Sequence, residues 1–128
     1  MSVQKTILLV DDDPVFVETT RIALEQHYNI RAAKDGKECL DAVEKEKPDL
    51  IILDVMMRHL SEGINVAEKL KRDENTRQIP IIMLTSVSQV YDMSTEVDPS
   101  EYQKSDIWIE KPVEPQKLLQ EIEKLLSK

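Results

Sequence analysis

Four short apolar runs in the sequence each end on polar side chains suited to binding a cation and a phosphoryl group. The runs and the side chains that follow them are 6–10 with Asp11, Asp12 and Asp13; 50–53 with Asp54; 80–84 with Thr85; and 107–110 with Lys111. If the runs are neighbouring parallel strands, these side chains meet at the carboxyl edge of one sheet, where ligands bind in open α/β sheets. The sequence therefore predicts an acidic cleft that also holds one hydroxyl and one ammonium group.

The carboxylates in such a cleft need a cation. Two ionised groups about 4 Å apart repel each other by roughly 4 kcal/mol at an effective dielectric of 20. Oxygen ligands with room for water favour Mg²⁺, or Mn²⁺, over zinc. A cation between Asp12 and Asp54 would neutralise an incoming phosphate, which makes Asp54 a candidate nucleophile that forms an aspartyl phosphate. Lys111 would then bind one phosphoryl oxygen as a point charge, the Thr85 hydroxyl would bind another, and Asp11 would complete the pocket.

Each of these residues also has a simpler explanation when taken alone. Asp13, just before Pro14, suits the cap of a helix at least as well as a site. Thr85 alone would be an ordinary turn residue, and Lys111 alone would be a solvated loop lysine. The hypothesis of a site depends on all four strand ends carrying the required groups in this order.

Strand and helix patterns alternate along the chain through five strands. This alternation predicts a doubly wound parallel α/β sheet with five helices on both faces, in the flavodoxin-like strand order 2-1-3-4-5. That order places the first and third strands side by side, so that Asp11, Asp12 and Asp54 face one another. The expected helices cover about 14–26, 37–47, 64–71, a poorly defined segment within 87–97, and a last helix from Pro115 with a clear apolar stripe. The stretch 55–63 is expected to be a loop, and the strand 30–33 is expected at an edge of the sheet.

Size and charge exclude several classes of protein. The chain has 128 residues, enough for one domain, and a net charge of −8 that disfavours direct binding to nucleic acid. The single cysteine, Cys39, has no partner for an internal disulfide and is expected to be buried in a helix. No long apolar stretch predicts membrane insertion or secretion, so we expect a cytoplasmic location.

The chain resembles the receiver domain of a bacterial two-component response regulator, in particular the stand-alone, chemotaxis-regulator-like kind. The matching stretches are 7–13, 48–57, 79–86 and Lys111–Pro112. The resemblance implies that Asp54 accepts a phosphoryl group from a sensor histidine kinase or a phosphotransfer protein, and later loses it slowly by autodephosphorylation. It also implies that Asp12, Asp54 and the backbone carbonyl of Met56 hold Mg²⁺, with Asp11 acting through water. Thr85 and Lys111 would contact the phosphoryl group.

Three features depart from the pattern of that family. Arg58 replaces the usual proline four residues after the phosphoacceptor, and Gly63 follows nine residues after it instead of eight, so the loop is one residue longer. The segment between Thr85 and Lys111 is also longer than usual. The switch aromatic of the family, usually Tyr or Phe, is Trp108 here; the alternative for Trp108 is a half-buried packing residue.

The function implied is a phosphorylation-activated signalling switch in a phosphorelay, and not an enzyme beyond its own phosphorylation and dephosphorylation. We expect residues 1–128 to be a single receiver domain without an output domain, which signals to another protein through roughly Val87–Lys128. One alternative is a degenerate receiver that binds a partner without phosphorylation. A second is a Mg²⁺-dependent phosphohydrolase, although Met56 stands where such enzymes place a general acid. A third is a flavin carrier, which would need a Ser/Thr/Gly-rich loop where Asp11–Asp13 stand.

Overall fold

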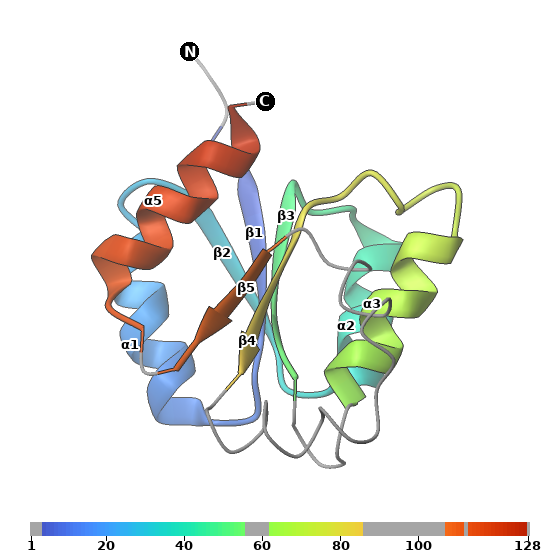
Figure 1. Ribbon diagram of the computed structural model, residues 1–128, viewed down its shortest axis with the longest axis horizontal. Coiled ribbons are helices and arrows are strands. Elements are labelled where there is room, and N and C mark those ends of the chain that lie inside the picture. The colour runs from blue at the N-terminus through green and yellow to red at the C-terminus, as the bar shows by residue number, and fades with distance from the viewer. Residues whose placement is uncertain (1–3, 56–61, 86–106, 112, 128) are drawn as a thin grey trace.

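The computed structural model describes residues 4–55, 62–85, 107–111 and 113–127, which form five strands and four helices. The strands are β1 (Thr6–Val10), β2 (Asn29–Ala33), β3 (Leu50–Asp54), β4 (Ile81–Thr85) and β5 (Ile107–Glu110). The helices are α1 (Pro14–Leu24), α2 (Gly36–Lys45), α3 (Glu62–Arg72) and α5 (Pro115–Leu126). All strand pairs are parallel and the order is β2-β1-β3-β4-β5, which confirms the predicted sheet (Figure 1).

Helices cover both faces of the sheet (Figure 1). One apolar core lies between the sheet and helices α2 and α3, and a second lies between the sheet and helices α1 and α5. All five residues of β3 and of β4 are buried, because these central strands are covered on both sides. β2 lies at an edge of the sheet, as expected. The buried Cys39 belongs to the first core, which confirms its expected packing role.

Local capping explains where helices α1 and α2 begin. The side chain of Asp13 accepts hydrogen bonds from the backbone N–H groups of Val15 and Phe16, and Pro14 occupies the first turn of α1. Asp35 accepts a hydrogen bond from the N–H of Glu38 at the start of α2. The interpretation of Asp13 as a helix cap is therefore confirmed.

Several predicted helix boundaries were wrong by one or two residues. Helix α1 ends at Leu24, helix α2 runs from Gly36 to Lys45, and helix α3 runs from Glu62 to Arg72. The expected loop 55–63 is therefore too long at its end, because its last two residues already belong to α3. The segment within 87–97 lies outside the described residues. No helix in the described ranges is long and apolar enough to cross a membrane.

Candidate functional site

The strand register brings the predicted site residues to one edge of the sheet. Val10 of β1 is paired with Leu53 of β3, so Asp11 and Asp54 follow at the same level. On the other side of β3, Asp54 is paired with Leu84, and Thr85 comes next in the chain. All strands point the same way, so each of these polar side chains stands at a carboxyl end. The predicted convergence of the first, third and fourth strand ends is thus a consequence of parallel pairing.

Three carboxylates form a cluster at this edge. Asp11, Asp12 and Asp54 each offer an oxygen, and these oxygens all lie within 4.8 Å of one another. Asp11 and Asp54 are buried, whereas Asp12 is exposed. The set is made of hard oxygen donors with one side open to solvent, which fits a hydrated Mg²⁺ or Mn²⁺ ion. Asp13 is not part of this cluster, because its side chain caps α1.

Lys111 links the two buried carboxylates. Its Nζ atom lies 2.8 Å from Oδ2 of Asp11 and 3.7 Å from Oδ2 of Asp54. The side chain of Asp11 is fully buried, while that of Lys111 is 23% exposed, so the ammonium lies at the boundary between the cluster and solvent. A buried carboxylate without such a partner would be strongly destabilising. Lys111 therefore neutralises part of the charge that a cation would otherwise have to offset.

The two oxygens of Asp11 have different partners. Oδ1 accepts a hydrogen bond of 2.9 Å from the N–H of Asp13, and Oδ2 is paired with Lys111. Both contacts hold the carboxylate in place at the end of β1. Asp12, by contrast, projects into solvent, where it is accessible to an incoming ion.

Phe16 is a site residue that the sequence did not reveal. The Nζ atom of Lys111 lies 4.5 Å from the centroid of the Phe16 ring, a cation–π geometry. Sequence patterning assigned Phe16 only to the apolar face of α1. Its one signal was its position three residues after Asp13, in the first turn of a helix that starts at the site.

Thr85 and Lys111 are joined through the backbone. Thr85 is buried at the end of β4, and its carbonyl oxygen accepts a hydrogen bond of 2.5 Å from the N–H of Lys111. Trp108 is half buried and packs against the core on the α2–α3 side, as in the interpretation of a packing residue. Met56 and Arg58 lie outside the described residues.

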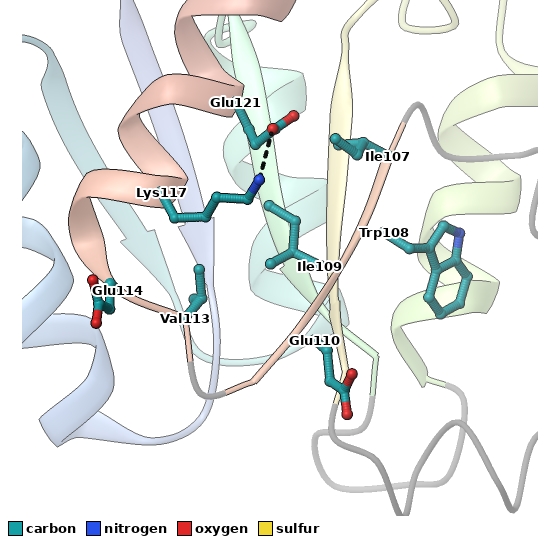
Figure 2. A pocket seen from close by; sticks show the side chains of 8 residues that line it. All are labelled: Ile107, Trp108, Ile109, Glu110, Val113, Glu114, Lys117 and Glu121. Carbon is teal, nitrogen blue, oxygen red and sulfur yellow. Dashed lines mark ion pairs between the residues drawn. The ribbon is translucent and has the colours of Figure 1, made fainter.

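A separate hollow of about 450 Å³ lies between β5 and α5 (Figure 2). Its lining includes Ile107, Ile109 and Val113, but none of the three clustered aspartates. Lys117 and Glu121 form an ion pair of 3.3 Å at this hollow, shown by the dashed line in Figure 2. Burial opposes ionisation of Glu121, but its contacts with Lys117 and a second lysine on α5 outweigh burial and lower the pKa of the carboxyl group.

The comparisons with known proteins agree with this fold. The model of the response regulator receiver domain family matches residues 7–123, and the chain belongs to this family. Domains of this family are phosphorylation-activated switches of two-component systems rather than classical enzymes, and they take phosphoryl groups from histidine kinases.

Individual relatives are similar to this chain over about half of their own length. The DNA-binding dual master transcriptional regulator RpaA of Synechocystis sp. is 33% identical over 95% of this chain and 49% of its own length. The phosphate regulon transcriptional regulatory protein PhoB of Pseudomonas aeruginosa is 36% identical over 98% of this chain and 53% of its own length. The chain thus spans about half the length of these curated relatives.

Solved structures include relatives of the same size. The chemotaxis protein CheY4 of Vibrio cholerae has a TM-score of 0.78 and 27% identity, over 97% of this chain and 100% of that chain. A CheY-like receiver domain protein of Methanospirillum hungatei has a TM-score of 0.78 and 28% identity, over 98% and 95% of the two chains.

Proposed function

We propose that this receiver domain accepts a phosphoryl group on Asp54 from the phosphohistidine of a sensor kinase or phosphotransfer protein. The observation that supports this most strongly is the placement of Asp54 within 4.8 Å of two further carboxylates and 3.7 Å from the Lys111 ammonium. Such a group of charges is costly without a ligand, and it is complementary to a divalent cation together with a phosphoryl group.

In the proposed reaction, an oxygen of Asp54 attacks phosphorus and the phosphorus–nitrogen bond of the donor breaks. The imidazole of the donor leaves with the electron pair of that bond. Lys111 exchanges part of its contact with Asp11 for a phosphoryl oxygen, and the Thr85 hydroxyl binds another oxygen. Asp12, Asp54 and the carbonyl of Met56 would hold Mg²⁺, with Asp11 acting through water, and the cation would supply charge neutralisation there.

Signalling follows from a shift between two arrangements of the Thr85 end of β4. Phosphate on Asp54 favours the arrangement in which the Thr85 hydroxyl binds it, and only this difference in affinity shifts the population. Thr85 and Trp108 are the proposed switch residues, and a downstream protein reads the surface from about residue 87 to 128. The cytoplasmic location and the assignment of residues 1–128 to one receiver domain remain predictions of the sequence. With a net charge of −8, direct nucleic-acid binding by this domain is not part of the proposal.

Intact mass after incubation with acetyl phosphate and Mg²⁺ tests the proposal. Wild type is expected to gain about 80 Da, the mass of one phosphoryl group. Asp54→Asn should gain nothing, and chelation of Mg²⁺ should abolish the gain in wild type. Asp13→Asn is a matched control, since Asp13 is a neighbouring aspartate outside the cluster, and it should be modified like wild type. No adduct on wild type, even with a phosphorylated histidine donor, would refute the proposal and favour a degenerate receiver that binds partners without phosphorylation.

A further inference from the structure

The Lys111 ammonium lies beside two carboxylates and one aromatic ring. Its Nζ atom is 2.8 Å from Oδ2 of Asp11, 3.7 Å from Oδ2 of Asp54 and 4.5 Å from the centroid of the Phe16 ring. The carboxylates can accept hydrogen bonds from the ammonium, which is a donor only. The ring attracts the same charge through the negative face of its π-system. Phe16 therefore binds the ammonium without offering an acceptor atom.

The segment that follows β1 places both Asp11 and Phe16 against this ammonium. The N–H of Asp13 donates to Oδ1 of Asp11 at 2.9 Å, while Oδ1 of Asp13 accepts the N–H of Phe16 at 3.4 Å. The carbonyl of Asp13 also accepts the N–H of Val17 at 3.0 Å. The Phe16 side chain is half buried and packs against the core on the α1–α5 side. The capped first turn of α1 and this core thus fix the ring in place independently of Lys111.

Lys111 benefits from such a support because it stands at the boundary of the cluster. Its side chain is 23% exposed, and the stem of a lysine side chain is long and flexible. Its shorter carboxylate contact is with Asp11 rather than with Asp54. In the proposed reaction the ammonium weakens the contact with Asp11 and binds a phosphoryl oxygen. The ring permits this exchange, because its attraction requires only that the ammonium stays over the ring face.

We propose that Phe16 is a positioning residue for phosphoryl transfer. Its ring holds the Lys111 ammonium beside Asp54 while the ammonium exchanges Asp11 for a phosphoryl oxygen. In this role Phe16 acts through Lys111 and contacts no reacting atom. The inference rests on the proposed function, because it takes Asp54 to be the phosphoacceptor and Lys111 to bind the phosphoryl group.

Phe16 is the single phenylalanine of the chain, which makes a graded test possible. Protein produced with a fluorinated phenylalanine in place of phenylalanine is changed at this position alone. Ring fluorine withdraws electron density from the negative face, while the side chain keeps nearly the same size and shape. The initial rate of phosphorylation by acetyl phosphate at saturating Mg²⁺ is followed by intact mass. It should fall stepwise from phenylalanine through the monofluorinated to the trifluorinated ring, by about three- to fivefold in all.

Three ordinary substitutions separate the ring face from the bulk of the side chain. Phe16→Leu keeps an apolar cover but has no ring, and it should lower the initial rate by about fivefold. Phe16→Tyr keeps a ring and should stay within about twofold of wild type. Val17→Ala removes an apolar contact with the same core, so it should lower the melting temperature and leave the initial rate unchanged.

The inference is overturned if the initial rate is the same across the fluorinated series, or if Phe16→Tyr is as slow as Phe16→Leu. It is also overturned if Val17→Ala slows the reaction as much as Phe16→Leu does, because loss of packing would then explain the effect. Wild type that takes no phosphoryl group would defeat the proposed function and this inference together. Wild type that is phosphorylated on Asp54 at a rate that fluorination does not change would defeat the inference alone.

Discussion

Replacing Asp54 by asparagine should stabilise the protein in the absence of divalent cations. The substitution keeps the size and shape of the side chain and removes one of three clustered negative charges. The relevant comparison is between the repulsion that is removed and the attraction to Lys111 that is lost. Both quantities follow from distances in the site.

The repulsion is larger than the attraction. Oxygens of Asp11 and Asp12 lie within 4.8 Å of an oxygen of Asp54, so at an effective dielectric of 20 each repels it by at least about 3.5 kcal/mol, or about 7 kcal/mol together. The attraction to Lys111 at 3.7 Å is about 4.5 kcal/mol on the same scale. The difference is about 2.5 kcal/mol, and solvent screening at the exposed Asp12 reduces it to about 1–2 kcal/mol.

Urea unfolding followed by circular dichroism at pH 7.5, low salt and excess chelator measures this difference. In a thermal melt in the same buffer, the melting temperature of Asp54→Asn should rise by about 3–8 °C for a domain of this size. Asp13→Asn should lie within about 0.5 kcal/mol of wild type, because asparagine is an equally good helix cap. Added Mg²⁺ should stabilise wild type more than the variant and so reduce the gap. If Asp54→Asn is no more stable than wild type under chelating conditions, the electrostatic reasoning about the cluster is wrong.

Four further outcomes follow from single contacts. Lys111→Met should destabilise the Mg²⁺-free protein by about 3 kcal/mol in urea unfolding, because it leaves buried Asp11 without its ion pair. Lys124 is exposed, so the control Lys124→Met should change the free energy of unfolding by less than about 0.5 kcal/mol. Gly63→Ala should lower the free energy of unfolding by at least about 3 kcal/mol, since the added Cβ meets the backbone of β3. A loss of only about 1 kcal/mol already lowers the melting temperature by about 2 °C or more, so a melting temperature within about 2 °C of wild type would contradict this prediction. Burial raises the pKa of the Cys39 thiol to about 12, so a disulfide reagent at pH 8 should modify it slowly in the folded protein and quickly in urea; equal rates would contradict its burial. The lowered pKa of Glu121 means that its contribution to stability is complete above the ordinary value of 4.5 and is lost as the pH falls through the folded-state pKa. Glu121→Gln should therefore be less stable than wild type at pH 6, and the difference should shrink toward pH 3; a difference that does not change with pH would contradict the assignment.

The sheet and the gathering of the site were predictable because they depend on local patterns. Short apolar runs that alternate with helical patterns determine a parallel sheet, and right-handed crossovers leave few strand orders. Once β1 and β3 are neighbours, Asp11 and Asp54 must lie at the same level, because the side chain after each run is carried to the same edge. The positions of Thr85 and of Lys111 follow by the same reasoning.

What could not be predicted depends on contacts between distant residues. The pattern predicted that α3 begins at Ile64, because that is where the apolar repeat starts. The structure begins α3 at Glu62, whose side-chain partner is Gly36, 26 residues earlier in the chain. The contact of Phe16 with Lys111 also joins residues that lie far apart in the sequence. No local spacing carries information of this kind.

The position of Lys111 suggests how occupation of the site reaches the rest of the sheet. Its ammonium is held by Asp11 at 2.8 Å, while its backbone N–H is held by the carbonyl of Thr85 at 2.5 Å. A phosphoryl group on Asp54 would compete with Asp11 for the ammonium, and the same group would attract the Thr85 hydroxyl. Both responses act on the hydrogen bond that joins the ends of β4 and β5. Thr85 and Lys111, the two residues proposed to bind the phosphoryl group, share this backbone hydrogen bond, so a movement of one on phosphorylation displaces the other. Lys111 directly follows β5, which carries Trp108, so β5 is the strand that this movement reaches first.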